Sequence, residues 1–170
     1  FLASLLFNNA AFSQRKVKLV HADVQKGGKD YTKWIGKVVF THEDTQIQCD
    51  SAIRYNKTNL IEAYGHVQID EGDSIKITSK KLIYEGDTKI ARLRENVVFN
   101  KLNQVTLYTD FLDYERQKQL AYYYNNGKLV DSTNTLTSVK GYYETGSNMA
   151  SFKSKVIGKN PDYTLKTDTM

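Results

Sequence analysis

The chain has 170 residues, enough for one domain with a sizeable core, and a net charge of +5. Twelve tyrosines, seven phenylalanines and a single proline favour an ordered all-β chain over a disordered one. The lysines are scattered and form none of the runs that mark a nucleic-acid-binding arm, so we expect no nucleic-acid partner. The positive charge indicates solvated strand faces or attraction to a phosphorylated or membrane-derived ligand.

The N-terminus begins with an apolar run over residues 1–7, followed by the small-x-small pattern Ala11-Phe12-Ser13. This pattern is typical of the end of a secretory signal peptide, with cleavage after Ser13. We therefore predict a signal-peptide remnant over residues 1–13 and a β domain over residues 14–170, cut from a longer repeat array. A short amphipathic helix is the alternative for residues 1–13. No later stretch is apolar enough to span a membrane as a helix.

From residue 17 the chain repeats one unit of about 29 residues: an outgoing strand with a tyrosine, a polar turn, and a returning strand. The repeated tyrosines are Tyr55, Tyr84, Tyr114 and Tyr143, in steps of 29, 30 and 29. A repeat of this length buries its apolar face only by stacking on its neighbours. The fold class predicted is an all-β, repeat-built antiparallel β-jelly roll, an open two-sheet roll of roughly ten to twelve strands. The hairpin turns are expected near residues 56–59, 85–89, 115–119 and 144–148.

The alternation of apolar residues assigns the two faces of the strands. On the returning strands, Ala63 and Val67 share one face, and Leu93 and Val97 repeat that pattern with Arg94 on the opposite face. Such alternation indicates one wet face and one buried or lipid-filled face. On the outgoing strands the parity slips once, as between residues 75–79 and 82–84. A slip recurring at one place predicts a bulge or corner in each repeat.

No catalytic or metal-binding motif occurs: there is no nucleotide-binding loop, serine elbow or paired-cysteine spacing. His21, His42 and His66 fall at different positions of the repeat, so they are not expected to converge on a metal with Cys49, the single cysteine. The acidic run 70–73 fits a tight strand connection better than a calcium site. We predict a protein that is not an enzyme and needs no cofactor or metal.

The ordered recurrence of two half-motifs resembles the OstA-like family of periplasmic lipopolysaccharide-transport proteins. The first half-motif contains Ala-Asp and ends in a tyrosine, and its Ala-Asp is matched by Ala22-Asp23, Cys49-Asp50 and Thr109-Asp110. The second contains Gly-Asn-Val, matched by Gly36-Lys37-Val38, Gly65-His66-Val67 and Glu95-Asn96-Val97. The match covers residues 17–168. Lys80 and Val139 depart from the expected aspartate, and Glu95 and Ser154 from the glycine.

The resemblance implies an open jelly roll with lipopolysaccharide acyl chains between its sheets. It also implies a bridge between the inner and outer membranes, built with transport proteins of the same fold, and a periplasmic location. Physical chemistry agrees, because exposing an acyl chain of a dozen carbons to water costs on the order of 10 kcal/mol, about 0.8 per methylene. The residues expected to line the lipid-binding trough are Val38, Phe40, Ile47, Ala63, Val67, Ile69, Ile75, Ile77, Leu93, Val97, Phe99, Leu107, Leu112, Phe152 and Val156.

The two ends of the array are expected to carry unpaired strand edges, at residues 17–22 and 163–168. Such edges recruit other strands, so head-to-tail pairing is expected with copies of this chain or with partners of the same fold. Two other functions remain open. One is a structural or adhesive β-repeat protein of the cell envelope with a dry core. The other is carbohydrate binding, which would need an aromatic row on an outer face.

Overall fold

The computed structural model describes residues 16–102 and 104–170, which form fourteen β-strands and one 3-10 turn, η1 (Arg116–Lys118). All fourteen strands belong to one antiparallel sheet. The strands are β1 Lys18–His21, β2 Val24–Gly27, β3 Tyr31–His42, β4 Thr45–Tyr55, β5 Leu60–Glu71, β6 Ile75–Glu85, β7 Ile90–Lys101, β8 Val105–Glu115, β9 Leu120–Tyr123, β10 Gly127–Val130, β11 Thr135–Ser138, β12 Lys140–Glu144, β13 Met149–Lys159 and β14 Thr164–Thr169. The all-β class and the four turns are confirmed. The predicted strand number was too low, because several repeats are divided into two short strands.

The long strands β3 to β8 bend in the middle, at a bulge that recurs in every neighbouring pair. In β5 the bulge holds Gly65 and His66, with φ of 71° and 39°, and in β7 it holds Glu95 and Asn96, with φ of 66° and 53°. These two left-handed residues lie opposite a single residue of the outgoing strand, so the ladder shifts and the strand turns a corner. The bulge predicted from the parity slip is confirmed.

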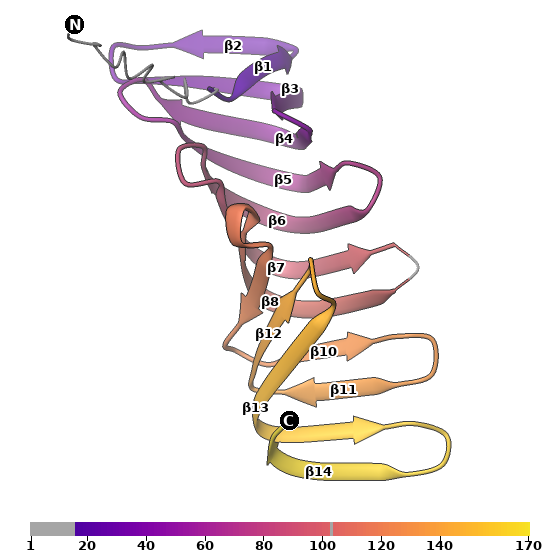
Figure 1. The fold of residues 1–170 in the computed structure, drawn as a ribbon. Helices are drawn as coiled ribbons and strands as arrows, with labels where there is room; N and C mark the ends of the chain where they lie inside the picture. Colours follow the sequence, from indigo (N-terminus) through magenta and orange to yellow (C-terminus); the bar gives the residue numbers. More distant parts are fainter. Residues whose placement is uncertain (1–15, 103) are drawn as a thin grey trace, which may run out of the picture.

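The corner divides the sheet into two facing halves. We call the half that ends in the turns near residues 56–59, 86–89, 116–119 and 145–148 arm A. Arm B is the half that ends in the turns near residues 43–44, 72–74, 102–104, 131–134 and 160–163. Several arm B turns project to the right in Figure 1, where the strands stack along the long axis of the molecule. The two sheets of the expected roll are therefore two halves of one sheet.

Beyond β8 the arms are carried by separate strands. Arm A continues through β9 and β12, arm B continues through β10 and β11, and β13 then pairs with both. We call these short strands, β9 with β10 and β12 with β11, the two divided rungs. The buried ring of Tyr123 fills the space between them. A Cβ added at Gly127 or Gly141 would lie 2.5 Å from that ring, so only glycine fits at either place.

The core lies between the arms, and aromatic rings meet across it. Trp34 of arm A contacts Phe40 of arm B with ring centroids 5.3 Å apart, and Phe99 of arm B contacts Tyr114 of arm A at 5.9 Å. At one end of the sheet β1 and β2 pair only with β3, and at the other end β14 pairs only with β13, within the described residues. The edges at β1 and β14 therefore lie where the sequence predicted them, whereas the edge strand β2 was not predicted.

Candidate functional site

All fifteen residues expected to line the trough are buried, with exposed fractions of 8% or less. Thirteen of them belong to one contiguous apolar cluster between the arms. Phe152 and Val156 are buried on β13 but lie outside that cluster. The parity argument thus identified one shared interior, while the role of these residues in lipid binding stays a prediction.

Arm A contributes interior residues that the sequence reasoning missed. Leu82 and Tyr84 are fully buried, although they lie on the opposite parity from Ile75 and Ile77 of the same strand, and Tyr114, 1% exposed, shares the parity of the predicted Leu112. On the outgoing strands β6 and β8 the ladder shift reverses the parity, so both halves point inward, whereas on the returning strands β5 and β7 the two bulge residues leave the parity unchanged. The slip was visible in the sequence, and applying it would have placed these side chains in the core. Other missed interior residues are Trp34, Ala52, Ala121, Tyr123 and Tyr143; Ile61 and Ala91, on the same parity as Ala63 and Leu93, also belong to the cluster.

Aspartates of the repeated motif hold the corners. The Oδ2 atom of Asp50 lies 2.7 Å from Nδ1 of His66, and the backbone N–H of Asn96 donates to Oδ1 of Asp110 at 3.0 Å. A Cβ at Gly65 would lie 2.3 Å from the carboxylate oxygen of Asp50, so glycine is required there. Each carboxylate thus serves a bulge in a neighbouring strand. The bulge of β7 uses Asp110, which explains why Lys80 can replace an aspartate on the other side of β7.

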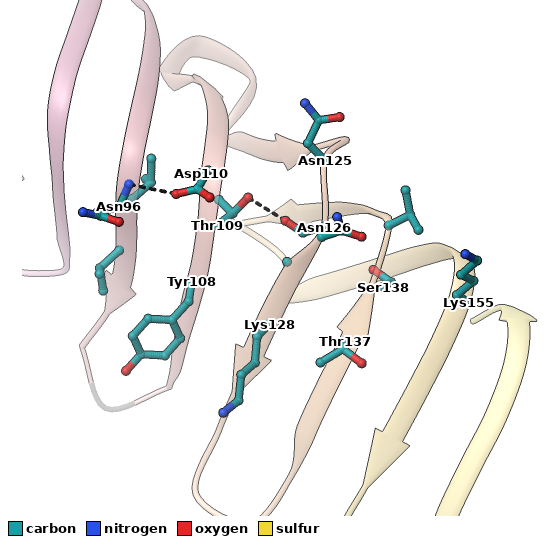
Figure 2. A pocket seen from close by; sticks show the side chains of 14 residues that line it. Asn96, Tyr108, Thr109, Asp110, Asn125, Asn126, Lys128, Thr137, Ser138 and Lys155 are labelled. Carbon is teal, nitrogen blue, oxygen red and sulfur yellow. Dashed lines mark hydrogen bonds between the residues drawn. The ribbon is translucent and has the colours of Figure 1, made fainter.

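A cavity of about 630 Å³ opens at the corner next to the divided rungs. Figure 2 shows that polar side chains such as Asn96, Asp110 and Lys155 line most of it, and that the hydroxyl of Thr109 donates to the backbone oxygen of Asn126, at 2.7 Å. Among the predicted trough residues only Val97 contributes to its lining. This cavity is therefore separate from the apolar interior.

The tips of the two arms meet along the side opposite the corner. Nζ of Lys89, in an arm A turn, lies 2.7 Å from Oε2 of Glu43 in an arm B turn. Arg116, in η1 of arm A, places Nη2 2.7 Å from Oδ1 of Asp44 and Nε 3.1 Å from Oε2 of Glu71, both in arm B. We call these five residues the seam.

Further side chains extend this contact along the molecule. The hydroxyl of Tyr84 lies 2.8 Å from Nδ1 of His42, and Nζ of Lys101 donates to the backbone oxygen of Thr145 and to Oδ1 of Asn148. In the described residues, the backbone bonds outside the ladders join no arm A tip to an arm B tip. The roll is therefore open in its backbone and closed by side chains.

The electrostatics of the seam follow from burial and pairing. Burial alone would lower the pKa of Arg116, but the nearby Glu71 carboxylate, helped by the hydrogen bond to the Tyr84 hydroxyl, outweighs it and holds the pKa above its ordinary value. The hydrogen bond from Lys89 lowers the pKa of Glu43. Burial, followed by the nearby Glu71, raises the pKa of Tyr114. At neutral pH the seam therefore consists of paired, charged groups in contact with the edge of an apolar core.

The outer face of arm A carries aromatic rings near the divided rungs. Tyr122 stacks on Tyr142 with centroids 6.0 Å apart, and Phe111 lies 6.4 Å from Tyr124. Arg94 lies over Phe111 and donates to Oδ1 of Asp113 at 2.7 Å. The outer face thus has the aromatic rings that carbohydrate binding would require, and Arg94 takes part in a specific ion pair on that face.

The described residues, 16–102 and 104–170, lack both a metal-holding cluster and a membrane-crossing helix. No group of three or more His, Cys, Asp or Glu side chains is arranged to hold a metal ion in this part of the chain. The same part contains no helix of a length and hydrophobicity suited to crossing a membrane. The signal-peptide remnant predicted over residues 1–13 lies outside the described residues.

Comparison with known proteins bears on the family. A family model described as OstA-like protein matches residues 14–168, which confirms the resemblance found in the motifs. No curated protein matches the chain. Among solved structures, the chain is similar to LptH of Pseudomonas aeruginosa, described as the LptA homologous periplasmic component of the conserved lipopolysaccharide transport device. The identity is 12%, the match covers 83% of this chain and 84% of that one, and the TM-score is 0.34.

Proposed function

Because the chain belongs to the OstA-like protein family, we propose that it binds the acyl chains of lipopolysaccharide between arm A and arm B. In this proposal it is a non-catalytic, periplasmic module of a bridge between the inner and outer membranes. The observation that carries the proposal is the single apolar cluster between the arms, which extends from Val17 near β1 to Tyr143 in β12. A continuous apolar interior matches a ligand whose several chains must all be kept from water.

The energetics favour an elongated apolar site over scattered surface contacts. Each methylene removed from water contributes about 0.8 kcal/mol, so a bound acyl chain gains in proportion to the length of trough that it occupies. Along arm A the interior carries four small side chains among larger ones: Ala52 pairs with Ala63, and Ala91 and Ala121 lie on either side of Tyr114, each alanine at most 1% exposed. These small residues leave depth for a chain once their larger neighbours rotate aside.

The direct experiment is to purify the protein from a lipopolysaccharide-producing host and identify the lipid that purifies with it by mass spectrometry. We expect stoichiometric lipopolysaccharide. A structural protein with a permanently dry core would yield none. That result would leave the fold assignment intact and remove the proposed function.

A matched pair of variants locates the ligand. Val97→Asp places a charge in the interior, where Val97 is 1% exposed, and should abolish lipid binding because the charge must be desolvated. Val98→Asp, on the outer face of the same strand, is the control. Arg94, also on the outer face of β7, would be a poorer control position because its side chain pairs with Asp113. Equal loss of bound lipid in both variants, with folding intact, would argue against the interior as the binding site.

For the bridge, we propose head-to-tail pairing through the free edges of β1–β2 and β14, with partners of the same fold or with copies of the chain. The N–H of Asn160 bonds to the oxygen of Tyr163, so the alternation of the ladder turns the amide of Leu165 toward β13 and that of Lys166 toward the free edge. Lys166→Pro should therefore weaken assembly in light scattering across a concentration series, while Lys166→Ala should not. A monomer at all concentrations for both variants and the unmodified chain would leave only the partner-protein route.

A further inference from the structure

We propose that the seam is the gate through which acyl chains reach the interior, and that Lys89 and Arg116 exchange their carboxylate partners for the ligand's phosphates when it opens. This inference rests on the proposed function and deepens it, because it assigns a site to the charged headgroup. The ligand class is an amphiphile that carries phosphate next to several acyl chains.

The interior must open before it can accept a chain. Phe40, Ile77 and Leu93 are fully buried, and aromatic contacts such as Phe99–Tyr114 and Phe99–Tyr143 span the space between the arms. An acyl chain can enter only if the side chains on the two arms move apart. In this structure the two arms are closed on each other.

The seam is the boundary that gives way most readily. At the corner, the arms are continuous through the backbone of β3 to β8 and through their ladders. At the tips, the described arms meet only through side chains. Lys89 and Glu43 keep 24% and 30% of their side-chain surface exposed, and a pair that is this accessible to water contributes little stability. Parting the tips breaks no β-ladder.

Opening separates the charges by sign. The cations Lys89 and Arg116 remain at the tip of arm A. The carboxylates of Glu43, Asp44 and Glu71 remain at the tip of arm B. The side chain of Arg116 is only 7% exposed in the closed state, so losing its carboxylates without replacement would leave a poorly solvated cation. A phosphate can replace both, because the guanidinium fork binds phosphate and carboxylate oxygens in the same bidentate geometry. The headgroup is thus expected on arm A.

The outer pair allows the test, because changing the buried Arg116 would risk the fold. Glu43→Gln and Lys89→Gln both remove the same ion pair, but only Lys89→Gln removes a cation from the tip of arm A. Opening of the seam is monitored by the rate at which Cys49 reacts with a thiol reagent. Cys49 is the only cysteine, and its buried side chain lies on the face of β4 that points into the core. Binding is measured with lipid A and with dephosphorylated lipid A, each in neutral detergent micelles.

We expect both variants to react faster at Cys49 by about two- to fivefold, the range that loss of a partly exposed ion pair supports. Glu43→Gln should bind both probes at least as well as the unmodified protein. Lys89→Gln should bind dephosphorylated lipid A normally and lipid A several-fold more weakly.

Each other outcome is decisive. Unchanged Cys49 reactivity in both variants, with intact thermal unfolding, would show that the seam does not gate the interior. Identical lipid A affinities in the two variants would show that the seam cations do not receive the phosphates. If the unmodified protein binds neither probe, the proposed function fails, and this inference fails with it.

Discussion

The regular rungs, β3 to β8, and the divided rungs, β9 to β12, build the same two arms in different ways. In the regular rungs one strand of eleven or twelve residues carries both arms around a bulge. In the divided rungs each arm has its own strand of four or five residues. Tyr123 fills the resulting gap, and its hydroxyl lies 2.7 Å from Oγ of Ser138.

The comparison shows that facing arms, rather than unbroken strands, define this fold. The corner can be held by a bulge and an aspartate, or by an aromatic ring packed over glycines. The tips differ as well. Carboxylate ion pairs close the regular part, whereas Lys101 closes the divided part through neutral oxygens of Thr145 and Asn148. The charged gate therefore belongs to the regular rungs.

The largest expected difference between the two parts is in packing. Leu93 is fully buried in the regular part, so Leu93→Ala should lower the free energy of unfolding by about 3 kcal/mol through lost burial and a cavity. Leu129 in β10 is only partly buried, so Leu129→Ala should cost about 1 kcal/mol or less. Urea denaturation measures both. Equal costs would mean that the divided rungs are packed as tightly as the regular ones.

The divided rungs should be more sensitive at their glycines. Gly141→Ala should cost about 2 kcal/mol, because the new Cβ would lie 2.5 Å from the buried ring of Tyr123. Gly158→Ala is the matched change, since nothing lies within 4 Å of its added Cβ. Thermal unfolding should separate the two variants. If Gly141→Ala unfolds like Gly158→Ala, the packing of Tyr123 does not hold the corner.

The corners of the regular rungs should depend on their aspartates. Asp110→Ala removes the acceptor for the N–H of Asn96 and should cost about 1 kcal/mol, a modest value because the site is exposed. Lys80→Ala, across β7, should change stability by less than about 0.5 kcal/mol. Denaturant unfolding of the two variants provides the measurement. A larger loss from Lys80→Ala would overturn the assignment of Asp110 to this bulge.

The smallest expected effect is the pH dependence of the seam in the regular part. Since the pKa of Glu43 is lowered from 4.5, its pairing stabilises the closed seam above about pH 4.5, and the stabilisation is lost as the pH falls through the lowered value. The stability difference between the unmodified protein and Glu43→Gln should therefore shrink in acid. A Lys101→Gln variant should show no comparable acid-dependent change, because its partners are uncharged. Unfolding curves at several pH values would detect the contrast.

Much of the fold follows from local patterns. The tyrosine spacing predicted the turns, and the slip of parity predicted the bulges, because both depend on residues close together in the chain. Alternation on the returning strands predicted interior residues such as Ala63, Val67, Leu93 and Val97. Tyr84 was missed because the parity slip of β6 was not carried into the list of interior residues, and Tyr114 was missed although Leu112, on the same face of β8, was predicted.

The seam could not be predicted in the same way. Arg116 stands in a polar run that looks like an ordinary turn, yet it binds Asp44, 72 residues earlier in the chain. Its contact depends on how far the arms curl toward each other, which no local pattern encodes. Likewise, the division of the arms into separate strands after β8 was not predicted from the sequence. The role of Tyr123 in filling the gap emerged from the tertiary packing.

The central claim is that acyl chains bind between the arms. Photo-crosslinking in a lipopolysaccharide-producing host tests it most directly, with p-benzoylphenylalanine placed at Phe99 or at Tyr108. Phe99 is fully buried between the arms, whereas Tyr108, on the outer face of the neighbouring β8, is 46% exposed. We predict crosslinks to lipopolysaccharide from position 99 and none above background from position 108. Crosslinks that are equal at both positions, or found only at position 108, would contradict the account.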